Sequence, residues 1–272
     1  VIKERLRRFA AALPNIAGKS VASRVFVDDG PMNDRAAAER SGVGWFGKNT
    51  NILTTSHGSW VFLSQVVTDL DLAPDMPLKK TCGSCVLCID DCPTGAIVAP
   101  YVLDNRRCIS FLTIELRGPI PRELRPLVSD WVFGCDICQE VCPVNRKSAL
   151  SQEPAFKKRH DFNAPELLPL LDMDDEAFRA RFRSSPIKRA KLAGLQRNVC
   201  VALGNIGDPA AVPALIGALS HGEPLVRQHA AWALGRIGGS DARQSIASAL
   251  GQEQKDEVRE ELELAMAEAG AA

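Results

Sequence analysis

No stretch of the sequence is apolar over the roughly 20 residues that a membrane-spanning helix needs, and no secretory signal peptide is recognisable. The formal net charge is zero, because 33 Lys and Arg balance 33 Asp and Glu. The total charge therefore does not indicate binding to nucleic acid or to a membrane surface. No GxGxxG motif follows a predicted strand, which leaves a nicotinamide cofactor without a recognisable site. The histidines at positions 57, 160, 221 and 229 lack the spacing of zinc ligands, and we interpret them as structural. We therefore expect a cytoplasmic protein without a membrane segment.

What the sequence does contain is cysteine in two motifs. Residues 82–93 read C-x2-C-x2-C-x3-C-P, the bacterial pattern of [4Fe-4S] ligands. An isolated cysteine at 108 is followed by C-x2-C-x3-C-P at residues 135–143. In two-cluster proteins the fourth cysteine of each run ligates the other cluster. We therefore assign Cys82, Cys85, Cys88 and Cys142 to one [4Fe-4S] cluster and Cys92, Cys108, Cys135 and Cys138 to a second.

Two other uses of these cysteines are zinc binding and disulfide formation. Zinc favours four ligands arranged as two CxxC pairs, rather than two runs that each end in CP. Disulfides are typical of exported proteins, which this sequence does not resemble. Cys200 lies in the apolar run "NVCVALGNIG", and we interpret it as a buried small hydrophobic residue.

The pattern of the remaining residues predicts an α+β multidomain protein with three regions. Residues 1–78 read as a mixed α/β domain with helices over 1–13 and 32–42, a strand near 23–27, and a hairpin over 51–70 that turns at 56–59. Residues 79–148 form the two-cluster, ferredoxin-like domain, which is too rich in loops to be stable without metal. Residues 149–272 form an all-α domain.

An internal repeat defines the helical domain. "ALGNIGD" at 202–208 recurs as "ALGRIGG" at 233–239, a displacement of 31 residues, and a weaker third copy follows. Helix pairs at this period are typical of HEAT-like repeats, in which each pair covers the apolar face of the next. An ordinary helical bundle is the alternative.

Four segments together carry a family resemblance. "RVFVDDGPMNDRAAAERSGVGWFGKNTNIL", "CGSCVLCIDDCPTGAIVAPYVLDNRRCISFLTIE", "GCDICQEVCPVNR" and "LQRNVCVALGNIGD" resemble, in this order, the epoxyqueuosine reductase family. Members of that family extend further at the N-terminus, so we expect that this chain lacks an N-terminal part that completes the site.

The resemblance implies a base-off cobalamin cofactor besides the two [4Fe-4S] clusters, with residues 1–78 forming the C-terminal part of the cobalamin domain. The implied reaction is reduction of epoxyqueuosine to queuosine at the wobble position of tRNA, the last step of queuosine biosynthesis. The substrate would be an anticodon stem-loop that carries epoxyqueuosine. We also expect an external low-potential reductant and a monomer.

Specific residues follow from this resemblance. It makes Asp28 the proton donor and a cofactor contact, in an apolar pocket that raises its pKa. Capping of the turn before Gly30-Pro31 is the alternative for Asp28, as it is for Asp29. The family signature in "GVGWFGKNT" places further cobalamin contacts in a loop that otherwise serves packing. Two hydroxyls beside Cys108 either contact the corrin or bond to local backbone. The predicted cobalamin contacts are Gly44, Trp45, Lys48, Asn49, Ser110 and Thr113.

A basic segment provides the predicted tRNA contact. Residues 178–198 contain seven Lys or Arg and no Asp or Glu. Such a local excess of positive charge is the expected footprint of phosphate binding, and a solvated linker helix is the alternative. The predicted tRNA-binding residues are Arg183, Lys188, Arg189, Lys191 and Arg197.

Two rival functions use the same motifs. A cobalamin reductive dehalogenase would share the first two regions, but a small organohalide needs no extended basic scaffold. A ferredoxin-type electron-transfer protein would need only the cysteines, yet most of the chain lies outside them.

Overall fold

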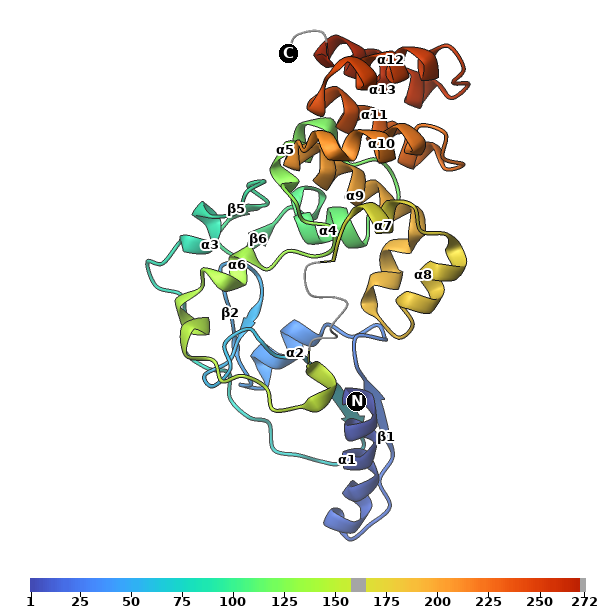
Figure 1. Cartoon of the computed structure of the whole chain (residues 1–272). Helices are drawn as coiled ribbons and strands as arrows, with labels where there is room; N and C mark the ends of the chain where they lie inside the picture. Colours follow the sequence, from blue (N-terminus) through green and yellow to red (C-terminus); the bar gives the residue numbers. More distant parts are fainter. Residues whose placement is uncertain (158–164, 270–272) are drawn as a thin grey trace. The chain divides into compact units, whose positions relative to one another are not determined.

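The computed structural model describes residues 1–157 and 165–269, which form two compact units (Figure 1). The first unit contains residues 1–92, 97–103 and 136–157, and the second contains residues 93–96, 104–135 and 165–269. The cysteine-rich region 79–148 therefore contributes segments to both units. Its predicted independence as a separate domain remains a prediction, as do the domain boundaries at 78 and 148.

The helices predicted at the start of the first unit are confirmed. Helix α1 (Ile2–Ala17) ends at Gly18, whose φ of 64° is left-handed, as is typical after a helix. Helix α2 (Asp34–Arg40) begins after Asn33, because the Asn33 side chain accepts a hydrogen bond from the backbone N–H of Ala36 at 3.1 Å. It ends before Gly42, whose φ is 70°.

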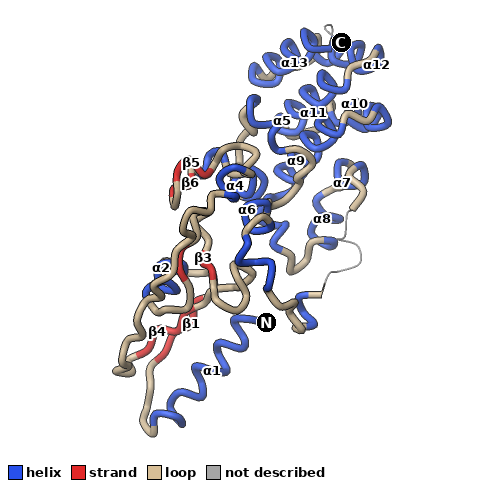
Figure 2. The backbone as a smooth tube through the Cα atoms, turned by 90° about the vertical axis from the view of Figure 1, so that its left-hand side faces the viewer, coloured by secondary structure: helices blue, strands red, loops and turns tan. Residues whose placement is uncertain are grey.

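Three small antiparallel strand pairs complete most of the first unit (Figure 2). Strand β1 (Ser23–Phe26) pairs with β4 (Gln65–Thr68), β2 (Trp45–Phe46) pairs with β3 (Ile52–Leu53), and β5 (Ile97–Ala99) pairs with β6 (Val102–Leu103). The predicted hairpin over 51–70 is therefore wrong. A tight turn does form, with Thr54 N–H donating to the Gly58 carbonyl at 2.8 Å, but the strands on either side pair elsewhere.

The first unit also contains short helices. They are α3 (Leu87–Asp90), α6 (Ile137–Glu140) and the 3-10 helices η3 (Pro143–Lys147) and η4 (Pro154–Phe156).

The second unit is almost entirely helical. Its longer helices are α9 (Lys191–Ile206), α11 (Pro224–Ile237), α12 (Ser240–Leu250) and α13 (Asp256–Ala269). The shorter ones are η1 (Asn105–Arg107), α4 (Ile109–Ile114), η2 (Arg122–Leu124), α5 (Arg125–Val128), α7 (Leu168–Leu171), α8 (Asp175–Arg181), η6 (Pro186–Ala190), η7 (Pro209–Ala211) and α10 (Val212–Ala218).

The repeated "ALGxIG" sequence marks where successive repeat helices touch. Helix α11 packs against both α9 and α13. A Cβ at Gly204 of α9 would lie 2.9 Å from the Cα of Ala233, and one at Gly235 of α11 would lie 2.8 Å from the Cα of Ala265. The repeated glycine therefore allows the backbones of neighbouring helices to approach closely. This contact explains why the sequence recurs at the period of the helix pairs.

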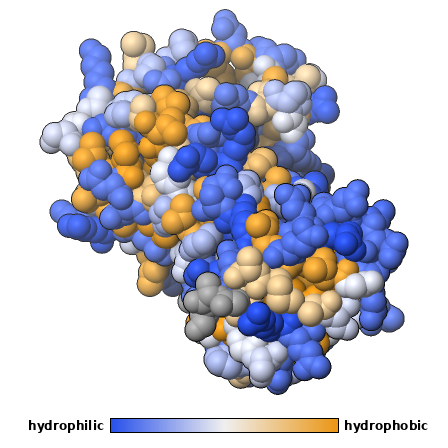
Figure 3. Space-filling model, turned by 90° about the horizontal axis from the view of Figure 1, so that it is seen from above, coloured by the Kyte–Doolittle hydropathy of each residue, from blue (hydrophilic) through white to orange (hydrophobic). Residues whose placement is uncertain are grey.

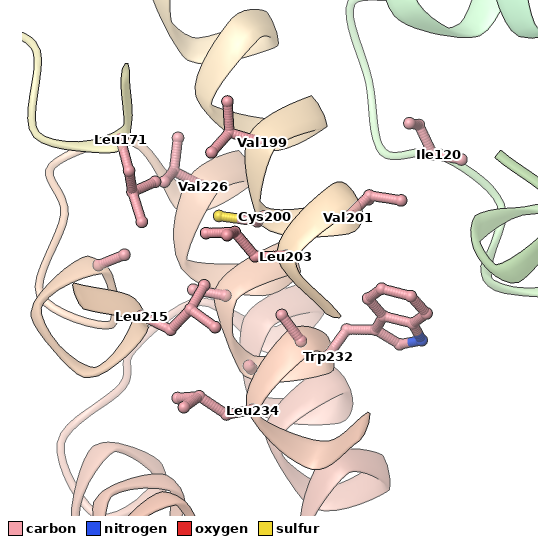
Figure 4. Packing of buried hydrophobic residues seen from close by; sticks show 14 of the residues in the cluster. Ile120, Leu171, Val199, Cys200, Val201, Leu203, Leu215, Val226, Trp232 and Leu234 are labelled. Carbon is pink, nitrogen blue, oxygen red and sulfur yellow. The ribbon is translucent and has the colours of Figure 1, made fainter. Parts of the chain in front are cut away.

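The core of the second unit is apolar and continuous (Figure 4). Cys200 lies in this core, where its sulfur is surrounded by aliphatic side chains such as Val226 and Leu203. Burial raises the pKa of the Cys200 thiol to about 12, so the thiol stays neutral. The predicted role of Cys200 as a buried hydrophobic residue is confirmed.

His229 is also structural. It accepts a hydrogen bond from Ile120 N–H on Nε2 at 3.2 Å and bonds the Leu225 carbonyl through Nδ1 at 2.8 Å. Burial, with positive charge nearby, lowers its pKa well below the usual value. His160, which was also predicted to be structural, lies outside the described residues.

On the face drawn in Figure 3, apolar side chains are scattered among polar ones. Among residues 1–157 and 165–269, no helix is both long and apolar enough to cross a membrane.

Candidate metal centre

The first predicted set of four cysteines comes together in the first unit. Cys82, Cys85, Cys88 and Cys142 line one small cavity. The cavity is completed by residues of the neighbouring segments, namely Gly47, Lys48, Asn49, Leu53, Leu87 and Pro143. Two cysteine runs that are separated by about 50 residues of sequence thus supply ligands to a single site, as the exchange of fourth cysteines predicts.

Short turns set the positions of these thiols. Gly83 has a φ of 54°, and Cys85 N–H donates to the Cys82 carbonyl at 3.1 Å, which closes a tight turn. In the second run, Cys142 N–H donates to the Gln139 carbonyl at 3.1 Å before Pro143 starts η3. The turns direct successive cysteines inward, as a metal cluster requires.

The electrostatics of the cavity also favour the binding of positively charged metal ions. The pKa of the Cys88 thiol is raised, first by burial and then by the neighbouring thiols of Cys82, Cys142 and Cys85. Four thiolates crowded together repel each other unless a cation lies among them. Iron would reverse this effect, because a metal ion stabilises a coordinating thiolate.

Zinc binding and disulfide formation, the two alternatives, depend on how the thiols are arranged. None of the nine cysteines, all of which lie in the described residues, forms a disulfide. Throughout the described ranges, no three His, Cys, Asp or Glu side chains converge as they would around a single metal ion. Four thiols that surround a cavity suit a cluster better, because each thiolate then binds a different iron.

The second predicted set is divided between the two units. Cys92 and Cys138 belong to the first unit, whereas Cys108 and Cys135 belong to the second. Their assignment to a common cluster remains a prediction.

Asp28 and Asp29 differ in their surroundings. Asp28 is exposed, has a φ of 48°, and lines an open cavity of about 640 Å³ with Met32, Phe62 and Leu63. The described residues alone therefore do not form the dry pocket expected for it. Asp29 accepts a hydrogen bond from Val27 N–H at 2.7 Å and forms an ion pair with Lys3, and the Lys3 bond lowers its pKa. Asp29 thus has the structural role.

In the loop that was predicted to contact cobalamin, two side chains bond to the backbone of the cysteine loops. Lys48 Nζ donates to the Gly83 carbonyl at 2.8 Å, and Asn49 Nδ2 donates to the Cys138 carbonyl at 2.9 Å. Neither residue is among the described residues that line the Asp28 cavity. A Cβ at Gly44 would lie 2.5 Å from Ile52, so this glycine is required by strand packing. Trp45 is buried beneath Lys80, and within the described chain its Nε1 has no hydrogen-bond partner.

The two hydroxyls that were predicted to contact the corrin form hydrogen bonds with the backbone. Thr113 is 0% exposed, donates to the Ile109 carbonyl at 2.7 Å and accepts from Gly134 N–H at 3.0 Å. The predicted corrin contact of Thr113 is therefore wrong, because its hydroxyl is fully used and inaccessible. Ser110 Oγ donates to the Cys135 carbonyl at 3.2 Å, which supports a ligand of the second predicted cluster.

The basic segment does not form a single helical face. It runs through α8, η6 and the start of α9, with Arg183, Lys188, Arg189 and Lys191 exposed. Arg189 pairs with Glu115 at 2.5 Å.

The predicted tRNA contact of Arg197 is wrong. Arg197 is 0% exposed, and its guanidinium donates to the carbonyls of Leu112 (2.6 Å), Leu116 (2.9 Å) and Gly118 (2.7 Å). Burial lowers its pKa to about 10, which still leaves it charged at neutral pH. Its function is to join α9 to the segment that follows α4.

Sequence reasoning missed two asparagines near the cysteines. Asn145 Nδ2 donates to the Gln139 carbonyl at 2.7 Å, and its Oδ1 accepts from Ser59 N–H at 2.8 Å. Asn51 Nδ2 lies 4.0 Å from the sulfur of Cys138. Both asparagines lie inside segments quoted for the family resemblance. Their partners Ser59 and Cys138 are distant in sequence, so no local pattern indicates these contacts.

Comparison with known proteins agrees with the two features found here. Residues 81–145 match the 4Fe-4S double cluster binding domain, and residues 189–267 match HEAT repeats. Together with the thiol-lined cavity, these matches define an iron–sulfur protein with a helical repeat unit.

Whole-chain relatives specify the family. Epoxyqueuosine reductase of Bacillus anthracis is 38% identical over 96% of this chain and 69% of its own length. The Escherichia coli K12 relative of that name is 44% identical over 78% of this chain and 56% of its own length. A crystal structure of selenomethionine-labelled epoxyqueuosine reductase covers 98% of this chain and 72% of its own, with a TM-score of 0.92 and 33% identity. The chain belongs to the epoxyqueuosine reductase family.

One further structure carries a ligand. Epoxyqueuosine reductase with an epoxyqueuosine-modified tRNA-Tyr stem loop matches 99% of this chain and 72% of its own, with a TM-score of 0.89 and 33% identity. The family assignment argues against the two alternative functions, a stand-alone ferredoxin and a reductive dehalogenase.

Proposed function

We propose that this protein reduces epoxyqueuosine to queuosine at the wobble position of tRNA, using cobalamin and two [4Fe-4S] clusters. The observation that carries the proposal is the match, over nearly the whole chain, to an epoxyqueuosine reductase bound to a modified stem loop. The reaction removes the epoxide oxygen and leaves an alkene. It consumes two electrons and two protons, and the oxygen departs as water.

The electrons would pass through the clusters. We propose Cys82, Cys85, Cys88 and Cys142 as ligands of one cluster, because these thiols share a cavity. Cys92, Cys108, Cys135 and Cys138 are the proposed ligands of the other. Such clusters reach the strongly negative potentials that the reaction requires, and an external low-potential donor would reduce them.

Cobalamin, when bound in its base-off form, would supply the cobalt nucleophile that opens the strained ring. The residues around Asp28 fit part of such a site. The cavity volume of about 640 Å³ is within the usual range for cofactor sites. Phe62, which is 70% exposed, offers apolar surface on the cavity wall. Trp45, whose Nε1 has no hydrogen-bond partner among the described residues, does not line this cavity.

Asp28 is the proposed proton donor. It lies on the wall of this cavity, whereas Asp29 is held by Lys3 and Val27. A bound cofactor and substrate would cover Asp28, and its carboxyl would donate a proton to the leaving oxygen.

The second unit would bind the tRNA. Lys188 and Lys191 are exposed cations in a segment that has no acidic residue, and Arg183 and Arg189 extend the same charge. These side chains would contact phosphates and position the anticodon stem without reading its sequence. The protein would act as a monomer in the cytoplasm, which stays a prediction.

The experiment compares Asp28→Asn with Asp29→Asn. Each protein is reconstituted with iron, sulfide and cobalamin, reduced, and given an epoxyqueuosine-bearing anticodon stem-loop. Mass spectrometry then measures the loss of one oxygen atom. We expect Asp28→Asn to lower turnover by at least about 100-fold with unchanged cluster content, and Asp29→Asn to remain active. Equal turnover by wild type and Asp28→Asn would remove Asp28 from the proposed role.

A further inference from the structure

One side-chain amide outside the cysteine motifs points at a predicted cluster ligand. Asn51 Nδ2 lies 4.0 Å from the Sγ of Cys138, and both residues belong to the first unit. Asn51 directly precedes β3 and is half-buried. An amide N–H in this position can donate to sulfur, for which hydrogen bonds are longer than to oxygen.

The loop that carries Asn51 is held rigidly. Gly47 N–H donates to the Asn51 carbonyl at 2.8 Å, and Thr50 N–H donates to the Gly47 carbonyl at 2.9 Å. Thr50 has a φ of 65°, which is rare for a β-branched residue and costs conformational energy. Arg35 donates to the Thr50 carbonyl at 3.0 Å and stabilises this conformation. The position of Asn51 is therefore fixed by its own loop.

Asn49 connects this loop to the same cysteine. Its side chain is only 5% exposed; Nδ2 donates to the Cys138 carbonyl at 2.9 Å and Oδ1 accepts from Asn51 N–H at 3.2 Å. One asparagine thus fixes the backbone of Cys138 and the backbone of Asn51 together. These two bonds fix the position of the Asn51 amide relative to the Cys138 sulfur.

We propose that Asn51 is a positioning residue that donates an N–H···S hydrogen bond to the Cys138 thiolate and raises the reduction potential of the cluster that Cys138 ligates. Reduction adds one electron to this cluster and breaks no bond. The additional negative charge increases the electron density on the ligating sulfurs, so a donor to one of them stabilises the reduced state. The inference rests on the cluster assignment within the proposed function, and not on the substrate or on cobalamin.

Two substitutions test this role. Asn51→Leu removes the donor at similar size, and Asn51→Asp replaces the donor with an acceptor at nearly identical shape. Neither disturbs the backbone bonds of the loop. We expect the midpoint potential of one cluster to become more negative in Asn51→Leu and more negative still in Asn51→Asp. The other cluster, bound by Cys82, Cys85, Cys88 and Cys142, should keep its potential and serves as an internal control.

The measurement is an anaerobic redox titration followed by electron paramagnetic resonance, with iron content checked for each variant. Unchanged potentials in both variants, or equal shifts of both clusters, would overturn the proposal. Pulsed resonance of the reduced wild-type protein, with asparagine side chains labelled with ¹⁵N, provides a second test if the variants fail to assemble. A nitrogen coupling to the cluster supports the proposal, and its absence contradicts it. Neither readout requires turnover, so failure here leaves the roles of Asp28 and tRNA binding unaffected.

Discussion

The second unit buries a large apolar cluster that includes Trp232, Leu234 and Val199, and all residues of this cluster belong to that unit. The first unit buries far fewer apolar side chains among its described residues, chiefly Trp45, Ile52 and Leu53. Its strands are also short, with two to four residues each. Repeat packing thus stabilises the second unit by itself, whereas the first unit must obtain much of its stability from cluster ligation.

Removal of iron should produce the largest difference in stability between the two units. Chelation and oxidation of the clusters should make amide exchange in residues 79–92 and 136–148 at least ~100-fold faster, which corresponds to about 2.7 kcal/mol. Helices α9, α11 and α13 should keep their protection, because they contain none of the proposed cluster ligands and pack on one another through buried apolar side chains. Hydrogen exchange with mass spectrometry compares the two regions in one sample. Retained protection in the cysteine loops would show that the first unit does not depend on its clusters.

Two glycines on α9 provide a matched test of repeat packing. Gly204→Ala places a Cβ 2.8 Å from the Trp232 ring and 2.9 Å from the Ala233 backbone, so we expect a loss of about 1–3 kcal/mol. At Gly194 the added Cβ meets only Ala190, at 3.9 Å. Gly194→Ala should therefore be neutral or stabilising by up to about 1 kcal/mol. Urea denaturation followed by circular dichroism measures both, and equal effects would argue against the close contact of α9 with α11.

Charge removal should affect tRNA binding by the second unit and leave the first unit unchanged. The double variant Lys188→Gln and Lys191→Gln should bind the stem loop about 10-fold more weakly, with a salt slope lower by about 2. Cluster content should remain that of wild type. Lys255→Gln, at another exposed lysine of the same unit, is the control. An unaltered slope in the double variant would assign this segment to structure.

The smallest predicted effect concerns acid stability of the second unit. Arg227 binds Glu253 through two bonds, Nε to Oε2 at 2.7 Å and Nη2 to Oε1 at 2.9 Å. This pairing lowers the pKa of Glu253 from 4.5 to about 2. Because the folded-state pKa is depressed, the stabilisation is complete above pH 4.5 and is lost as pH falls toward 2. We expect a loss of about 1 kcal/mol for this partly exposed pair.

Glu253→Gln isolates this contribution. The variant should be less stable than wild type at pH 6, and the difference should vanish near pH 2. Thermal unfolding at several pH values measures this difference. A constant difference across that pH range would mean that the carboxylate charge is not responsible.

The sequence predicted features that depend on spacing along the chain. The CxxC runs predicted which thiols line the first cavity, and the 31-residue repeat predicted the HEAT-like helices. Features that depend on distant partners were not predicted. The residues of β4 looked like the second half of a hairpin, but their partner is β1, some 40 residues earlier. Arg197 belonged to a basic run, but its position on the inward face of α9 turns it toward carbonyls of another segment.

In the proposed reaction, electrons stored in the iron–sulfur clusters reduce the epoxide. The protein, loaded with cobalamin and clusters, is fully reduced, freed of external reductant and mixed with the epoxyqueuosine stem-loop. Electron paramagnetic resonance then follows the reduced clusters while mass spectrometry quantifies queuosine. We predict loss of about two cluster electrons for each queuosine formed. Formation of queuosine with the cluster signal unchanged, or decay of the signal without queuosine, would contradict electron transfer from the clusters to the epoxide.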